Sequence, residues 1–239
     1  MNEPGEQQPT APPPPPPPEE PAAPRGNPWE RRDSLGFGSA LIEAIKLFVT
    51  SPKEAFAQTK LKGDYLGPLL FAIIVGWIGA LASQIWSLLF GASMMSMMPS
   101  ELQRSMGGHL MGSGFGLLLT VFLAPILMTV AVFVWTAIVH LCLVIVGGLE
   151  TSQAGFEGSF RVVSYSSVAQ LSNLVPLVGG VIGFFWTLVL AVVGIEKIHG
   201  TPQNKAIIAV LIPMILCCVC VAFGIFVAGA GLFSLFATQ

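Results

Sequence analysis

The feature that most constrains this chain is a stretch of 175 residues, 65–239, which carries only 8 of its 24 charged side chains. Soluble domains carry about 25% charged residues, whereas this chain has 10% and is 53% hydrophobic. A stretch so poor in charge cannot cover itself with a water-compatible surface, which places it in lipid. The composition predicts an all-α, polytopic membrane protein, and the net charge of −2 argues against a nucleic-acid partner.

Apolar runs divide this stretch into a bundle of five expected transmembrane helices. The second run is long for a hydrocarbon core, so tilt or a kink near Pro125 is expected. Pro176 and Gly179-Gly180 interrupt the charge-free run 162–195, which favours two short helices over one long helix. The five expected spans cover residues 68–90, 117–146, 162–177, 180–195 and 206–236.

The distribution of Lys and Arg tests this count. With five spans and the N-terminus inside, ten of the eleven basic residues fall on the inner side and only Arg104 falls outside. Merging residues 162–195 into one span changes the split to eight against three. The positive-inside bias therefore predicts a cytoplasmic N-terminus and an outer C-terminus. A re-entrant hairpin over 162–195 gives the same sidedness, and both forms stay open.

The N-terminal residues differ sharply in composition from the membrane region. Residues 1–28 hold 12 of the 19 prolines, so residues 1–33 are predicted to be a disordered cytoplasmic tail. This tail could be a spacer or a ligand for a Pro-binding protein, and the chain lacks flanking residues that decide between them.

Residues 34–62 follow as expected interfacial amphipathic helices. Glu43 and Lys46 lie opposite an apolar face, and Ser51-Pro52-Lys53-Glu54 predicts a capping box that starts a second helix. The pair would lie in the headgroup plane or dock on a protein partner, and both interpretations stay open. The apolar face consists of Leu41, Ile42, Ile45, Phe48 and Val49.

Residues suited to catalysis are scarce at membrane depth. The only aspartates, Asp33 and Asp64, precede the first span, and His140 has no carboxylate near it in the sequence. We therefore expect no enzyme activity, no cofactor and no metal site, and we interpret His140 as a contact between helices. A Met-rich outer connection could take Cu(I) or lie against lipid as a flexible hydrophobic loop. It contains Met94, Met95, Met97, Met98, Met106 and Met111 with His109.

The third expected span is the most polar of the five. Its polar side chains must face the bundle or a wet cavity, either as structural hydrogen bonds or as a translocation path or lipid groove. They are Ser164, Tyr165, Ser166, Ser167, Gln170, Ser172 and Asn173. Small residues also repeat every four positions, which suits helix contacts within the bundle or with a second copy. These seams are Ala72/Gly76/Ala80, Gly183/Thr187/Ala191 and Cys220/Gly224/Ala228.

Two motifs resemble the Yip domain family of membrane proteins that interact with small GTPases of the Ypt/Rab type. The stretch Asp64-Tyr65-Leu66-Gly67-Pro68 is similar to the family's Asp-Leu-Tyr-Gly-Pro signature, with Tyr and Leu exchanged. Residues 160–167, followed by Pro176, look like its third and fourth spans. The resemblance implies a five-helix membrane domain over residues 63–239 with a cytoplasmic N-terminus. It suggests the prokaryotic branch, hence an inner membrane. The candidate interaction residues are Asp64, Tyr65, Gly67, Pro68, Arg161, Tyr165, Gln170, Asn173 and Pro176.

These features favour a non-enzymatic scaffold or adaptor that recruits a protein partner through its N-terminal region. On this hypothesis, deletion of residues 1–58 removes partner binding while the bundle stays folded. The alternative is a permease or lipid-translocating protein that uses the polar face of the third span. Membrane lipids are partners in either case, and a second copy of the chain stays open.

Overall fold

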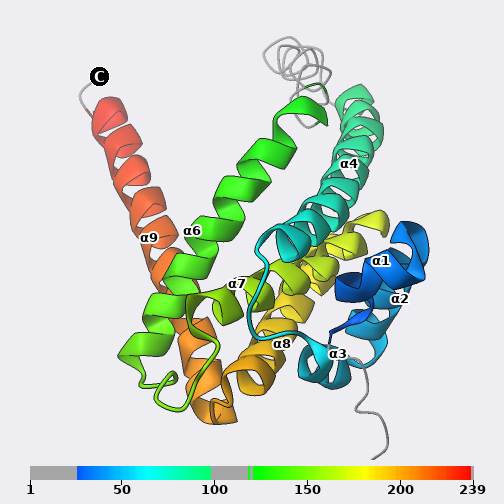
Figure 1. Cartoon of the computed structure of the whole chain (residues 1–239). Coiled ribbons are helices and arrows are strands. Elements are labelled where there is room, and N and C mark those ends of the chain that lie inside the picture. The colour runs from blue at the N-terminus through cyan, green and yellow to red at the C-terminus, as the bar shows by residue number, and fades with distance from the viewer. Residues whose placement is uncertain (1–25, 98–117, 119–120, 238–239) are drawn as a thin grey trace, which may run out of the picture.

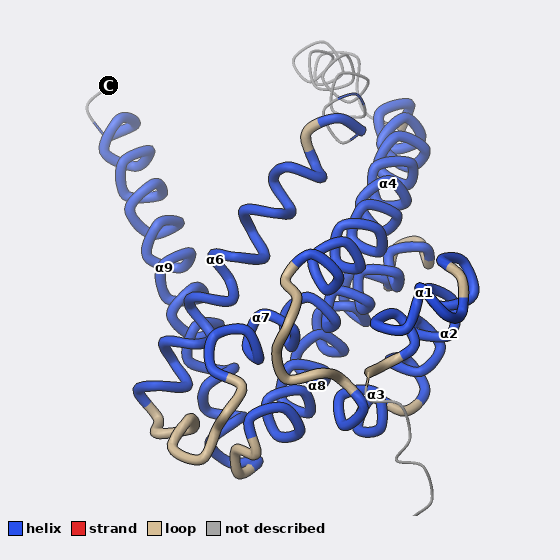
Figure 2. The backbone as a smooth tube through the Cα atoms, in the orientation of Figure 1, coloured by secondary structure: helices blue, strands red, loops and turns tan. Residues whose placement is uncertain are grey.

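The computed structural model describes residues 26–97, 118 and 121–237, and every regular element in these ranges is helical (Figures 1 and 2). The predicted all-α class is therefore confirmed for the part described. In chain order the elements, with η for a 3-10 helix, are η1 (Pro28–Arg31), α1 (Arg32–Leu35), α2 (Phe37–Thr50), α3 (Pro52–Gln58), α4 (Leu66–Ser96), α6 (Ala124–Ile145), α7 (Gly155–Ser166), η2 (Ser167–Leu174), α8 (Gly179–His199) and α9 (Gln203–Ala237).

Three helices among the described residues are long and apolar enough to cross a membrane. They are Leu66–Gly91 within α4, Ala124–Ile145 and Gly179–His199. Large apolar side chains on these helices point outward; Leu141 and Ile145 of α6, for example, are 60% and 69% exposed. Hydrocarbon is the environment that suits such a surface. The chain is therefore a membrane protein, while the count of five spans stays a prediction.

The predicted break near Pro176 is confirmed. η2 ends at Leu174 and α8 begins at Gly179, and between them Leu177 adopts a positive φ of 66°. The first arm differs from the expected span 162–177, because it begins at Gly155 and changes from α-helix to 3-10 helix at Ser167. We call residues 155–199 the α7–α8 hairpin.

The helix is interrupted beside Pro125, where a kink was predicted. Residues 121–122 are helical, Leu123 is a turn, and α6 begins at Ala124 with Pro125 in its first turn. Proline fits there because the first turn of a helix does not need its N–H groups. Pro213, by contrast, lies inside α9, which covers the predicted last span of residues 206–236.

The N-terminal residues 26–59 form a compact head that packs on the bundle (Figure 1). Ala40, Ala44 and Phe48 of α2 are fully buried against the protein's own core, whereas Ile42 and Val49 are 67% and 46% exposed. Part of the predicted apolar face is thus covered by the chain itself and not by lipid or a partner. The expected interfacial position of these helices stays a prediction.

Two local expectations at the N-terminus need correction. Residues 26–33, expected within a disordered tail, are folded, and Asn27 and Trp29 are fully buried; residues 1–25 lie outside the described part. Helix α3 begins at Pro52 as predicted, but Ser51 makes no side-chain capping bond. The Glu54 N–H, which such a cap would satisfy, donates to the Ser51 carbonyl at 3.1 Å. The side-chain capping box forms instead at Asn27 and Glu30.

Candidate functional site

The most polar buried region joins the head to the α7–α8 hairpin, and Arg161 lies at its centre. Arg161 is 1% exposed and pairs through Nη1 with the Glu30 carboxylate of the head. Its Nη2 donates to Glu157 Oε1 at 2.8 Å and to the carbonyl of Asp64 at 2.9 Å. One guanidinium therefore ties together the head, the start of α4 and α7. We call this group of four residues the junction cluster.

Glu30 receives four donors at its two carboxylate oxygens. Besides Arg161, these are the Tyr165 hydroxyl at 3.1 Å, the Lys60 N–H at 2.9 Å and the Asn27 N–H at 3.2 Å. Burial raises the pKa of the Glu30 carboxyl above its ordinary value, and these donors oppose the rise. A carboxylate with this many donors is positioned firmly, which suits a structural anchor.

The family-like motif at the start of α4 is a helix cap joined to this cluster. Asp64 accepts from the N–H groups of Leu66 and Gly67, both at 2.8 Å, and so satisfies the first turn. Its own N–H donates to Glu157 Oε1 at 2.9 Å. The Gly67 carbonyl accepts from Trp29 Nε1 at 2.6 Å. The motif therefore begins the first membrane helix and holds the head against it.

The predicted site residues divide into two groups. Asp64, Gly67, Arg161 and Tyr165 come together at or beside the junction cluster. The remaining five lie elsewhere. Tyr65 is 42% exposed with its ring against Phe160, Pro68 is in the first turn of α4, Pro176 lies in the hairpin turn, and Gln170 and Asn173 line a groove.

An aromatic core beside the junction cluster fixes the head in place. The Phe48 ring stacks on Tyr165 with 4.9 Å between centroids and an interplanar angle of 15°, and Phe56 lies at 5.0 Å from Phe48. Phe56 also packs on α8, where a Cβ on Gly194 would lie 3.0 Å from its ring. Deleting residues 1–58 would therefore remove core side chains and leave Arg161 without Glu30. The structure argues against the expectation that the bundle stays folded after that deletion.

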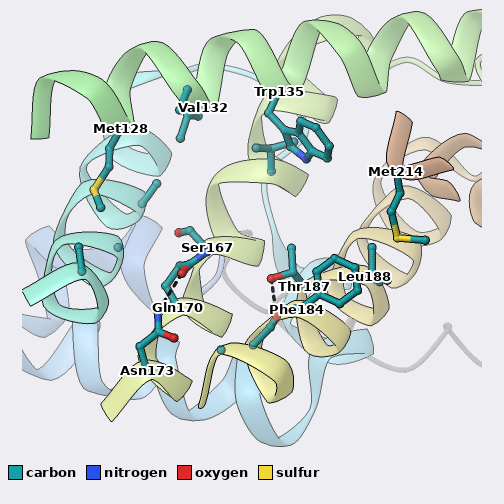
Figure 3. A pocket seen from close by; sticks show the side chains of 17 residues that line it. Met128, Val132, Trp135, Ser167, Gln170, Asn173, Phe184, Thr187, Leu188 and Met214 are labelled. Carbon is teal, nitrogen blue, oxygen red and sulfur yellow. Dashed lines mark hydrogen bonds between the residues drawn. The ribbon is translucent and has the colours of Figure 1, made fainter. Parts of the chain in front are cut away.

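The second candidate site is a groove between the membrane helices, with a volume of about 780 Å³ (Figure 3). One wall is the seam Ala72, Gly76 and Ala80 of α4. Met128, Val132 and Trp135 of α6, Phe184 and Leu188 of α8, and Met214 of α9 supply most of the other apolar surface. Ser167, Gln170, Asn173 and Thr187 are its polar side chains, and no lining residue among those described is ionisable.

The polar part of the groove lies at the middle of the α4 span. The backbone of Gly79 packs directly against the carbonyl of Gln170. Gly79 is 13 residues after Leu66 and 12 before Gly91, the ends of the candidate span. At a rise of about 1.5 Å per residue, Gln170 therefore lies beside the middle of this candidate span.

A third polar group links α6, α7 and α8, near the C-terminal ends of α6 and α8. His140 Nδ1 lies 2.9 Å from Ser159 Oγ, which lies 3.1 Å from His199 Nε2. Ser152 Oγ lies 2.7 Å from the other nitrogen of His199. His140 thus contacts a neighbouring helix as predicted. No carboxylate joins this group among the described residues, so we interpret it as helix packing.

Sequence reasoning missed four residues that build the site: Asn27, Trp29, Glu30 and Glu157. The signal for three of them was available, because Asn27-Pro28-Trp29-Glu30 has the spacing of a capping box with proline in its first turn. Glu157 could have been found from its spacing, because it precedes Arg161 by one helical turn and opposite charges at that spacing form ion pairs. Met94 and Met95, expected in an outer connection, belong to helix α4, and Met97 just after it is 87% exposed. Met98, Met106, His109 and Met111 lie outside the described residues.

The chain matches a known protein family over most of its length. The family model described as the Yip1 domain matches residues 45–225, which is most of the chain. No curated protein and no solved structure matches it. The matched range begins within α2 and includes the junction residues Asp64, Glu157 and Arg161.

Proposed function

Since the chain belongs to the Yip1 domain family, we propose that it is a non-enzymatic, five-pass membrane scaffold that recruits a protein partner through its N-terminal head. The observation that carries this proposal is the two-sided character of α2. Its inner side, with Ala40, Ala44 and Phe48, belongs to the core, while its outer side keeps Ile42 and Val49 exposed. Ile42 and Val49 are about two helical turns apart, and an exposed apolar pair at this spacing is typical of a helix that docks in a partner's groove.

The charged side chains beside this pair support a protein partner. Glu43 and Lys46 are exposed on the same helix, so the outer side of α2 combines an apolar centre with charges of both signs. Interfaces with a small apolar centre and a polar rim are common among reversible protein complexes. The junction cluster would hold this surface in a fixed orientation relative to the membrane, because Glu30 and Arg161 bridge the head and the bundle.

Photo-crosslinking tests the proposed surface. A photoreactive p-benzoylphenylalanine in place of Ile42 is expected to give a discrete protein adduct in native membranes, whereas the same residue in place of the exposed Ala57 of α3 gives none. Adding Val49→Asp is expected to lower the yield of the adduct about tenfold, because a buried unpaired charge costs that much or more. Adducts with lipid alone at position 42 would contradict a protein-binding head.

The five-pass arrangement, with an inner-membrane location in a prokaryote, is part of this proposal. α6 and α9 each run the length of the bundle, and α9 ends at Ala237 at the end away from the head (Figure 1). Both ends of the α7–α8 hairpin meet, since a Cβ on Gly158 would lie 2.9 Å from the His199 ring. This supports a hairpin that enters and leaves on the head's side.

Cysteine accessibility tests the sidedness. In a variant without the native cysteines, Gln239→Cys is expected to react with a membrane-impermeant maleimide on intact cells. Ser34→Cys in the head is expected to react only after permeabilisation, because ten of eleven basic residues lie on the head's side under this arrangement. If Ser34→Cys and Gln239→Cys react from the same side of the membrane, the number of passes is even and the five-pass arrangement is wrong.

A further inference from the structure

The two amides in the mid-membrane groove have more hydrogen-bonding capacity than the chain uses. Asn173 Nδ2 donates to Gln170 Oε1 at 3.2 Å, as the dashed line in Figure 3 marks. Among the described residues the remaining amide hydrogens and the Asn173 oxygen have no other partner, and Gln170 is exposed in the groove. Unpaired amides are costly in hydrocarbon, so a molecule that enters the groove gains by pairing with them.

The groove also restricts the charge of such a molecule. Its described lining contains no ionisable side chain, and it lies near the middle of the α4 span. A charged headgroup would be expensive there, because nothing compensates its lost hydration. An uncharged group with a hydrogen-bond acceptor is favoured, since the unused hydrogens of Gln170 and Asn173 are donors.

The remaining surface suits an alkyl chain. Ala72, Gly76 and Ala80 form a smooth wall, and Met128, Trp135 and Phe184 add flexible and flat side chains to the lining. A volume of 780 Å³ lies within the range of about 300–1,000 Å³ typical of sites that bury most of a ligand. Met can adapt to chains of different shape.

We propose that this groove is a binding site for an uncharged, carbonyl-bearing membrane lipid. Its alkyl chain lies along the α4 seam, and its carbonyl oxygen accepts a hydrogen bond from the Gln170 amide. The site selects against phospholipids because their charged headgroups cannot reach the depth of Gln170 with the carbonyl still bound. The inference does not depend on the partner surface of α2.

The test uses the full chain in phosphatidylcholine vesicles that contain diacylglycerol with a photoactivatable acyl chain. Labelled peptides are identified by mass spectrometry, and labelling is expected on α6 and α8 around Met128 and Phe184. Gly76→Leu is expected to abolish it, because the new side chain fills the groove and displaces only the flexible end of Met128, which lies 3.2 Å from a Cβ there. Gly91→Leu on the same helix is the matched control, since a Cβ at Gly91 meets nothing within 4 Å.

A second comparison tests the hydrogen bond between the Gln170 amide and the carbonyl of the lipid. Gln170→Leu is expected to lower labelling by the diacylglycerol probe about fivefold, the effect of one net hydrogen bond. The ether analogue, which lacks the carbonyl, is expected to label both forms equally and weakly. Equal labelling of Gly76→Leu and the unmodified chain would overturn the site, and equal labelling by a phosphatidylcholine probe would overturn its selectivity. Photoreactive p-benzoylphenylalanine at Val132 that yields a covalent dimer would assign the groove to a second copy instead.

Discussion

Replacing Arg161 with leucine is expected to lower the free energy of unfolding by about 3–5 kcal/mol, the usual cost of breaking a buried ion pair by removing one partner. The guanidinium is 1% exposed and bonds the Glu30 and Glu157 carboxylates and the Asp64 carbonyl. The variant leaves two carboxylates without their cation, in a region that water reaches poorly. Thermal unfolding in detergent, followed by tryptophan fluorescence and size-exclusion chromatography, measures the loss.

The exposed pair Lys197–Glu196 provides the matched control. Its atoms are 3.0 Å apart, but the two side chains are 34% and 27% exposed. Lys197→Ala is therefore expected to change stability by no more than about 1 kcal/mol. Arg161→Lys should lie between the two, because lysine keeps the charge but cannot donate to three acceptors in the same planar geometry. If Arg161→Leu unfolds at the same temperature as Lys197→Ala, the junction cluster does not hold the head.

The sequence was most informative where one residue acts through its own backbone. Pro176 cannot continue a helix, so the break between η2 and α8 could be predicted, whereas its exact form required tertiary contacts. Ser172 donates to the carbonyls of Ala169 and Gly179, and Gly79 lets α4 approach η2 closely. These contacts accompany a 3-10 segment that no periodicity indicates.

The site was harder to predict because its members are distant in sequence. Glu30 and Arg161 are separated by 131 positions, and without a fold nothing pairs them. The Pro-rich composition of the first 28 residues also hid a short ordered motif at their end. In α2 the apolar pattern was right for Phe48 but wrong for Ile42 and Val49, which are exposed, and it could not say what covers the buried face. Ala40 and Ala44 carry much of the burial, and their small side chains weigh little in a hydropathy pattern.

Replacing Phe48 with alanine is expected to lower the free energy of unfolding by about 3–5 kcal/mol, as for other buried aromatic residues. Phe48 is fully buried and lies between Tyr165, Phe56 and Phe71, at centroid distances of 4.9, 5.0 and 5.9 Å. The cavity cannot close easily, because Tyr165 is also held by its bond to Glu30. Early release of the head should appear as a red shift of Trp29 emission, since the buried indole would reach water; replacing the other four tryptophans with phenylalanine isolates this signal.

Ile42→Ala on the same helix separates folding from recognition. Ile42 is 67% exposed, so its truncation should change stability by less than about 0.5 kcal/mol while weakening crosslinking from a probe placed at Val49. Phe48→Ala should lower stability but leave the crosslink unchanged. The crosslink is measured at low temperature, where the head stays folded and Ile42 is unchanged. Two substitutions six residues apart on one helix would then affect different properties, because one faces the core and the other the exterior. Equal loss of stability in both variants would mean that the outer side of α2 is also packed, and the proposed partner surface would have to be abandoned.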